Sequence, residues 1–266
     1  MTELDKKRFE SICLSVAAEG LDAGGIGTMS EKRMHKALKR YICPEENYHE
    51  IRIKPDGSVS YDENDKSGRG GYIADIYSDG KIFEVQTGSF YPLQSKIKFY
   101  LENTDFDVTV VHPIIAVKWS VWVDPETGEA KKRRRSPKKE DLYTLLPEIF
   151  WLSEYLDNPR LNFRGLVIEA EEYRMLDGWS RDKKKGSSRY ERMPISLIDD
   201  ITVNSCEIGK RFLPEELSEE FTASDFGRIT KLKGKKLYGA LKVLCAVDAI
   251  EKGEKKGRSY VYRRTV

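Results

Sequence analysis

The sequence predicts an α/β protein with a mixed β-sheet, followed by a small basic domain at the C-terminus. The first observation is the order of apolar patterns between residues 30 and 113, which is helix, strand, strand hairpin, helix, strand. The second is a series of helix, turn, helix and hairpin signals after residue 212. The third is charge, because residues 222–266 hold 12 Lys and Arg against 4 Asp and Glu, while the rest hold 34 against 40.

Composition restricts the class of protein further. Hydrophobic residues make up 39% of the 266 residues, which is enough to build a folded core. No apolar run approaches the roughly 18 residues that a membrane helix needs, and the N-terminus lacks the layout of a signal peptide. The four cysteines are scattered, without the CxxC spacing of a zinc site. We therefore expect a soluble cytoplasmic protein with no membrane partner.

The first elements are helical. A helix is expected from Leu4 to Ala18, followed by a glycine-rich linker over residues 20–27. Ser30 can cap a second helix, which has apolar residues at helical spacing up to Ile42 and ends before Pro44. Residues 1–28 are thus predicted to be a helix and linker, and a core domain with an extension is expected over residues 29–211.

The strands of the core follow. Alternating and β-branched runs predict strands at His49–Ile53, Tyr72–Tyr77 and Lys81–Thr87, the last two joined by a tight Ser78-Asp79-Gly80 turn. Pro92 precedes a helix expected at 93–101, and the run 107–112 reads as a buried strand that Pro113 ends.

Residues 114–211 are expected to extend this core. The extension is predicted to contain a strand pair or one long strand at 114–123, an exposed basic loop at Lys131–Arg135, an aromatic-rich helix at 141–156, a strand at 161–168 and a polar loop at 181–192.

The last predicted domain covers residues 212–266. Helices are expected at 213–220, 224–231 and 235–249, and a hairpin with glycines near its tip is expected around residues 253–258. Helix, turn, helix and basic hairpin is the element order of a winged helix, in which one helix enters the major groove of DNA and the hairpin contacts the backbone.

The candidate chemistry of the core lies in Asp75 and the triplet Glu84-Val85-Gln86. If the two flanking strands pair around the turn at 78–80, the two carboxylates come close together. Two close carboxylates repel each other unless a hard cation such as Mg²⁺ lies between them. Gln86 would then border the metal site, and the side chain of Val85 would point into the core.

This stretch, roughly residues 31–113, resembles the PD-(D/E)XK nuclease superfamily in motif and in element order. The resemblance implies a restriction-endonuclease-like αβββαβ core, with Asp75 and Glu84 as ligands of Mg²⁺ or Mn²⁺, assisted by the carbonyl of Val85. An upstream acid often completes such a site, and Glu50 or Glu31 could take that place; Glu50 is favoured because its strand would neighbour that of Asp75.

The sequence departs from the superfamily at Gln86, where the family usually has lysine. A lysine there would orient or deprotonate the attacking water, whereas an amide can only orient it. Lys96, on the following helix, could supply the missing charge. His35 and His49 are predicted to fall near the site, where either could contact phosphate, and His112 is interpreted as structural.

The basic C-terminal domain predicts binding to nucleic acid, most simply duplex DNA. The candidate contacts are on the second helix and in the hairpin, at Lys235, Lys236, Tyr238, Lys242, Lys255, Lys256 and Arg258. No Arg or Asn on that helix is placed to read bases, so modest sequence specificity is expected.

Three functions remain open on the sequence alone. The first is a bacterial-type, metal-dependent DNA endonuclease, in which cleavage of both strands would call for a homodimer. The second is a DNA-binding regulator whose nuclease-like core is inactive, which the glutamine at position 86 favours. The third is a protein-interaction component of a defence or recombination complex.

Overall fold

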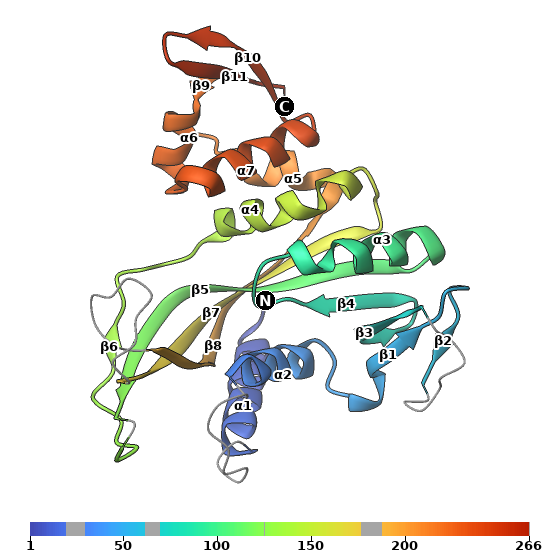
Figure 1. Cartoon of the computed structure of the whole chain (residues 1–266), viewed down its shortest axis with the longest axis vertical. Helices are drawn as coiled ribbons and strands as arrows, with labels where there is room; N and C mark the ends of the chain where they lie inside the picture. Colours follow the sequence, from blue (N-terminus) through green and yellow to red (C-terminus); the bar gives the residue numbers. More distant parts are fainter. Residues whose placement is uncertain (20–29, 62–69, 125, 177–187, 266) are drawn as a thin grey trace. The chain divides into compact units, whose positions relative to one another are not determined.

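The computed structural model of the chain describes residues 1–19, 30–61, 70–124, 126–176 and 188–265. Within these residues the protein is mixed α/β, with one sheet of eight strands and a second sheet of three; Figure 1 shows the arrangement of the strands. Its contacts divide into two compact units: residues 1–46, 113–141 and 166–200 form unit 1, and residues 47–112, 142–165 and 201–266 form unit 2. The predicted domain boundary at residue 212 falls inside unit 2.

The large sheet has the strand order β2-β1-β3-β4-β5-β7-β8, with β6 paired to β5. Its directions are mixed, because β1–β2, β1–β3, β3–β4 and β5–β6 are antiparallel while β4–β5 is parallel. The strands are β1 (His49–Ile53), β2 (Val59–Ser60), β3 (Tyr72–Ser78), β4 (Lys81–Val85), β5 (Asp107–Val123), β6 (Arg134–Arg135), β7 (Leu161–Met175) and β8 (Ser188–Asn204).

The turn between β3 and β4 has the geometry that the sequence predicts. Asp79 and Gly80 have φ angles of +50° and +74°, the left-handed conformation that a two-residue hairpin turn needs at both positions. Glycine and aspartate tolerate this region better than most residues. The turn therefore fixes the register that brings Asp75 and Glu84 together.

The helices around the core form where the apolar spacing predicts. In unit 1, α1 (Glu3–Glu19) contacts α2 (Ser30–Ile42) through the rings of Phe9 and Tyr41, whose centres are 5.2 Å apart. In unit 2, α3 (Gln94–Asn103) connects the parallel strands β4 and β5, and its side chains Ile97, Tyr100 and Leu101 are buried. A helix between two parallel strands is the crossover such a pair needs.

Strand β5 is longer than the sequence predicts, because Pro113 does not end it. Pairing with β4 stops at Val111, whose carbonyl accepts the N–H of Gln86, so the missing N–H of Pro113 leaves no gap on that side. A proline φ angle is also compatible with an extended backbone. The expected strands at 107–112 and 114–123 are thus a single strand.

The segment from 142 to 204 also differs in detail. The predicted helix at 141–156 is a chain of short turns, consisting of Leu142–Leu145, α4 (Leu146–Ile149) and Phe150–Tyr155. The predicted polar loop at 181–192 is wrong from Ser188 onward, because β8 begins there, and its remainder lies outside the described residues, as does the predicted linker at 20–27. The charged residues at 189–192 therefore form part of a strand rather than a loop.

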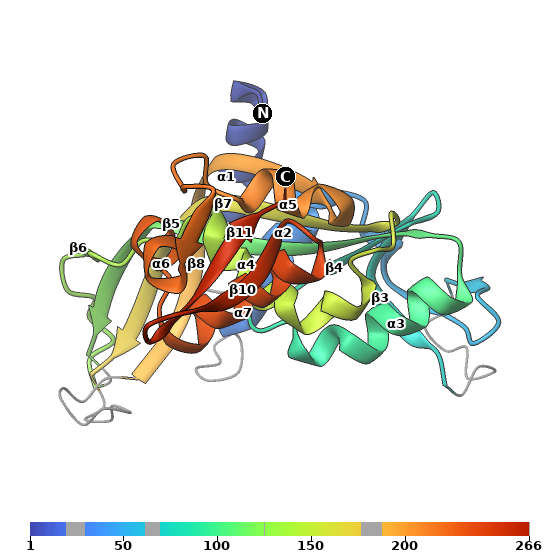
Figure 2. The same cartoon turned by 90° about the horizontal axis from the view of Figure 1, so that it is seen from above.

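The C-terminal part of unit 2 has the element order α5, β9, α6, α7, β10, β11. Its sheet has the order β10-β11-β9, and Figure 2 shows the β10–β11 hairpin beside α7. The bounds are α5 (Ile208–Phe212), β9 (Glu220–Thr222), α6 (Ala223–Thr230), α7 (Gly234–Ala246), β10 (Ile250–Lys256) and β11 (Ser259–Arg264).

The predicted helix at 213–220 is absent from this part of unit 2. Leu213 is extended, with φ −86° and ψ 111°, because the following Pro214 disfavours a helical conformation in the preceding residue. Helix α5 therefore ends at Phe212, and residues 220–222 instead form β9, which pairs with β11. None of the helices in the described residues is both long and apolar enough to cross a membrane.

Candidate active site

The register of β3 and β4 places Asp75 opposite Glu84. Ile76 pairs with Phe83 and Tyr77 with Ile82, so the next position along both strands is the Asp75–Glu84 pair. Facing residues of antiparallel strands project from the same side of the sheet. The Oδ2 atom of Asp75 accepts a hydrogen bond of 2.8 Å from the N–H of Val85, which holds this carboxylate across the end of β4.

The Glu84 side chain is buried, at 1% exposure, and α3 supplies partners for both of its oxygens. Lys96 Nζ lies 2.6 Å from Oε2, and the hydroxyl of Tyr100 donates to Oε1 at 3.1 Å. Lys96 and Tyr100 are one helical turn apart, and residues at this spacing share one side of a helix. The crossover helix therefore presents a cation and a hydroxyl to the same carboxylate.

The charge state of Glu84 reflects opposing effects. Burial raises the pKa of this carboxyl most strongly, repulsion from Asp75 raises it further, and Lys96 and Tyr100 lower it, which leaves the pKa at about 8. Burial and the neighbouring Glu84 likewise raise the pKa of Tyr100, so its hydroxyl remains a donor. A carboxyl with a strongly perturbed pKa beside a second acid and a lysine is typical of functional sites.

Gln86 lies at the end of β4, and its side chain is engaged locally. The amide nitrogen Nε2 donates to the carbonyl of Ser89 at 2.7 Å. The backbone carbonyl of Gln86 accepts a 2.6 Å hydrogen bond from Nδ1 of His112, whose ring also lies 5.3 Å from that of Phe90. These contacts fit the structural role expected for His112. In the described structure Lys96, rather than residue 86, places a nitrogen beside Glu84.

The predicted third acid is less well placed. Glu50 stands opposite Asp75 in the β1–β3 register, between the pairs His49–Ile76 and Ile51–Ala74. Its φ of +55° departs from an extended backbone, so strand alternation does not direct its exposed side chain toward the site. For the alternative, Glu31, only the backbone in α2 is described.

The donor set fits a magnesium ion that keeps several waters. Mg²⁺ is usually bound in proteins through one or two carboxylates together with water or substrate oxygens. Asp75 and Glu84 supply two adjacent carboxylates, and Val85 follows Glu84 in the sequence and donates its N–H to Asp75. In the part of the chain that the structure describes, no group of three His, Cys, Asp or Glu side chains gathers around a cation-sized site. Any metal here would thus be held by two acids.

Sequence reasoning missed Tyr100 as a member of this site. Its position among buried apolar residues of α3 favoured a core role, and the ring is indeed fully buried. The signal that identifies it is its spacing of four residues from Lys96, which puts both side chains over β4.

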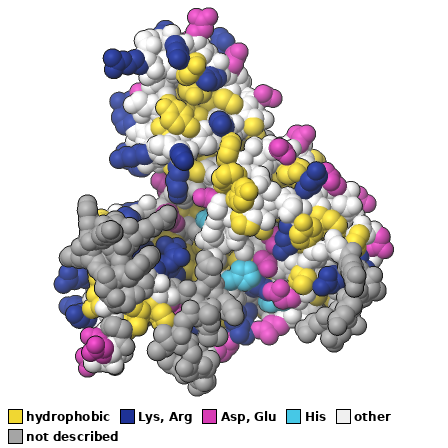
Figure 3. All heavy atoms as spheres, viewed as in Figure 1, with side chains coloured by type: hydrophobic (Ala, Val, Ile, Leu, Met, Phe, Trp, Pro, Cys, Tyr) yellow, Lys and Arg dark blue, Asp and Glu magenta, His cyan; other side chains and the backbone are white. Residues whose placement is uncertain are grey.

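The basic side chains predicted at the C-terminus are exposed, and Figure 3 shows Lys and Arg gathered on the C-terminal part of unit 2. In the hairpin, Lys255 Nζ lies 5.0 Å from the ring centre of Tyr260, and Lys256 is 3.3 Å from Glu220. Exposed residues on this surface are Lys235, Lys236, Tyr238, Lys242, Lys255, Lys256 and Arg258.

Helix α7 also packs within unit 2. Lys242 Nζ lies 5.3 Å from the ring centre of Phe150, and a Cβ at Gly239 would lie 3.8 Å from Pro147. The stripe of α7 that carries these two residues thus contacts α4 and the turn after it. Lys235 and Lys236, at the N-terminal end of α7, and the hairpin residues 251–260 are exposed.

The fold and site define an α/β protein whose mixed sheet carries an acid pair, beside which helix α3 places a lysine. The chain belongs to the family described as "Domain of unknown function (DUF8091)", which it matches over residues 32–204. The match covers the large sheet and ends before α5.

One curated relative is an uncharacterized protein of Treponema pallidum (strain Nichols), 27% identical over 197 residues. The similarity covers 74% of this chain and 64% of that protein, so this chain spans less than two thirds of the relative's length. No solved structure matches the chain.

Proposed function

We propose that this protein is a metal-dependent DNA endonuclease with a restriction-endonuclease-like core and a C-terminal winged-helix domain. The observation that carries the proposal is the placement of Asp75, Glu84 and Lys96 around one point at the end of β4. The sheet supports it, because β1, β3 and β4 form an antiparallel meander and β5 then runs parallel to β4, as in an αβββαβ core. The order α5-β9-α6-α7-β10-β11 supports a winged helix.

Each residue of the site has a role in this proposal. Asp75, Glu84 and the Val85 carbonyl would hold Mg²⁺ or Mn²⁺, which activates water and neutralises charge on a phosphodiester. Lys96 would keep a positive charge beside the attacking water, in the place of the lysine that position 86 lacks. Tyr100 positions Glu84 by donating its hydroxyl to that carboxylate. The side-chain amide of Gln86 fixes the chain after β4 by donating to the carbonyl of Ser89.

The test is cleavage of supercoiled plasmid with Mg²⁺ or Mn²⁺. We expect Asp75→Asn, Glu84→Gln and Lys96→Gln each to reduce the nicking rate by roughly 100-fold or more, the scale at which a positioned catalytic group contributes. Asp79→Asn and Lys98→Gln are matched controls, since they make the same charge changes on the same hairpin and the same helix. Equal nicking by the wild type and the three site variants would remove the proposal.

A second candidate function is DNA binding with an inactive core. The specific observation that favours it is the engagement of the Gln86 amide nitrogen by Ser89 in place of a catalytic lysine. Calorimetry separates the two candidates. Absence of Mg²⁺ and Mn²⁺ binding, together with tight and salt-sensitive binding to duplex DNA, would favour the second.

A further inference from the structure

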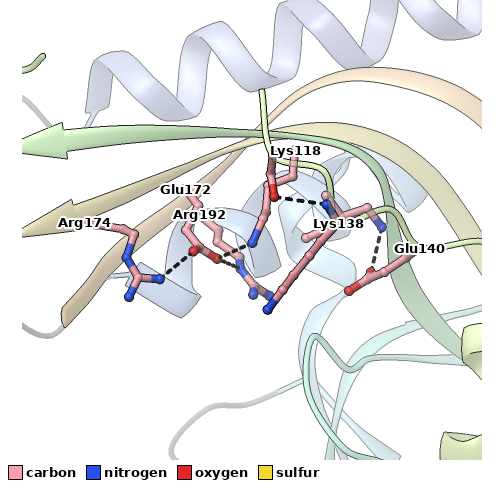
Figure 4. Close-up of polar contacts among 8 residues, drawn as sticks. Lys118, Lys138, Glu140, Glu172, Arg174 and Arg192 are labelled. Carbon is pink, nitrogen blue, oxygen red and sulfur yellow. Dashed lines mark hydrogen bonds and ion pairs between the residues drawn. The ribbon is translucent and has the colours of Figure 1, made fainter. Parts of the chain in front are cut away.

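A second polar cluster lies in unit 1, on the face of the three long strands. The strand order β5-β7-β8 sets Glu172 of β7 between Lys118 of β5 and Arg192 of β8 (Figure 4). Glu172 Oε2 lies 3.0 Å from Arg192 Nε and 3.5 Å from Lys118 Nζ, and Oε1 lies 3.0 Å from Arg174 Nη1. Arg174 follows Glu172 by two residues, which puts both on one face of β7. Three cations therefore converge on one carboxylate.

The cluster holds more positive than negative charge. The side chain of Glu172 is only 4% exposed, and burial alone would raise its pKa, but Lys118 and Arg192 outweigh burial and lower it. Glu172 is therefore ionised at neutral pH and forms ion pairs with all three cations. It fixes the two guanidinium groups, whose side chains remain 32% and 31% exposed. The Nη groups of Arg192 make no hydrogen bond within the described part of the chain and can donate to an outside acceptor.

A basic segment, residues 131–139, lies beside this cluster. The N–H of Ser136 donates to the carbonyl of Lys118 at 2.8 Å, and Glu140 is tied to Ile115 by two hydrogen bonds, so the segment is attached to β5 at both places. Seven of its nine residues from 131 to 139 are cationic and all seven are exposed. They are Lys131, Lys132, Arg133, Arg134, Arg135, Lys138 and Lys139.

Few of these charges are neutralised. Arg133 lies 2.8 Å from Glu171. For the other six cations, no acid of the described residues lies within ion-pair distance. The segment 131–139 is therefore an extended row of exposed positive charge rather than a set of paired surface residues.

We propose that the Lys118–Arg174–Arg192 cluster and the segment 131–139 form a binding surface for the phosphate groups of DNA. Arginine presents several donors in a rigid fork that matches phosphate oxygens, and here a buried carboxylate orients two such forks. The adjoining row of lysines and arginines extends the positive surface, as a ligand with regularly repeated phosphates requires. This surface deepens the proposed function, on which the choice of DNA rests, and it uses none of the catalytic residues.

The test measures binding without cleavage, using the full-length chain, a fluorescent 20-base-pair duplex, EDTA and a series of salt concentrations. We expect Arg174→Gln/Arg192→Gln to weaken binding at 0.1 M salt by roughly tenfold and to lower the slope of log K against log salt by about two. These changes remove two partners of the buried Glu172 and could lower stability, so a second variant, Arg134→Gln/Arg135→Gln, is measured as well. Those two side chains are exposed, and their loss should lower the slope by a similar amount with an unchanged melting temperature.

The charge-matched control is Lys7→Gln/Lys81→Gln, which removes two exposed cations from α1 and β4. Wild-type affinity and slope in both arginine variants would overturn the inference, as would an equal loss in the control. Weakened binding in the arginine variants of a protein that never nicks plasmid would support this surface while the nuclease proposal fails. Normal binding by them, with metal-dependent nicking intact, would reject this surface alone.

Discussion

The Glu84 carboxyl has two surroundings that favour opposite charge states. Burial favours the protonated acid, whereas Lys96 at 2.6 Å favours the carboxylate, and burial has the larger effect on the pKa. A divalent ion held by Asp75 and Glu84 would reverse this balance, because its charge exceeds that of the lysine. The charge state of this residue is therefore expected to report metal binding.

The first prediction at this scale concerns stability without metal. A pKa of about 8 for Glu84 lies above the ordinary value of 4.5 that the group has in an unfolded chain, so the folded state binds an additional proton between these two pH values. The free energy of unfolding should therefore fall as pH rises from 5 to 9, and Glu84→Gln should flatten this dependence. Urea titrations at several pH values in EDTA measure it. If the free energy of unfolding of the wild type and of Glu84→Gln had the same dependence on pH, the raised pKa of Glu84 would be contradicted.

A second prediction concerns proton release. Because Glu84 must lose its proton to become a ligand, Mg²⁺ binding should release protons at pH 7 and should tighten as pH rises toward 8. Isothermal titration in two buffers of different ionisation enthalpy measures the number released. The matched variant Asp79→Asn should behave as the wild type, whereas proton-neutral binding by the wild type would place the metal elsewhere.

Sequence patterns predicted some of these residues for physical reasons. A two-residue turn fixes register, so Asp75 and Glu84 could be paired from the sequence alone. Lys96 could be suggested because a crossover helix returns over the preceding strand. Tyr100 and Glu172 could not, since their roles depend on which neighbours burial brings to them, and Glu172 meets partners 54 positions before and 20 positions after it in the sequence.

At the level of elements, the capping box of α6 allows a stability prediction. Thr222 Oγ1 accepts the N–H of Asp225 at 3.3 Å, and Asp225 Oδ2 accepts the N–H of Thr222 at 3.0 Å, which satisfies two donors at the helix start. Thr222→Ala should lower the free energy of unfolding by about 1 kcal/mol. Ser224→Ala, an exposed change in the same turn, is the control for denaturant titration. An equal effect of both would exclude the cap as the cause.

Gly71, just before β3, allows a second prediction at this scale. A Cβ there would lie 2.1 Å from the carbonyl oxygen of Ile53, closer than any side chain tolerates. Gly71→Ala should therefore push β3 away from β1 and destabilise the protein by more than Gly88→Ala, where a Cβ would meet nothing within 4 Å. Thermal melting of the two variants compares them, and equal melting temperatures would contradict the close approach.

The boundaries of elements were predictable where local chemistry decides them. The helix at 30–42 and the β3–β4 turn follow from apolar spacing and turn residues. The continuation of β5 through Pro113 and the formation of β9 depend on which strands pair, and local sequence does not encode the partner. Leu213 is an exception, because the effect of Pro214 on the preceding residue was readable in the sequence.

For the whole molecule, the uneven charge leads to a prediction about binding. The hairpin cations Lys255, Lys256 and Arg258 are exposed, and exposed cations that meet phosphates release counterions. Changing all three to Gln should lower the salt slope of duplex binding by up to about three units. Arg263→Gln, which removes an exposed arginine paired with Glu251, is the control. An unchanged slope in the triple variant would argue against DNA contact by the hairpin.

The two units described above are assembled from interleaved segments, because the chain passes between them five times. A gene fragment that stops anywhere between codons 47 and 200 would therefore encode parts of both units and complete neither. A shortened version spares unit 1 only if the stop codon comes after Asp200. For this reason point substitutions, rather than deletions, are suited to assigning activities to unit 1 and unit 2.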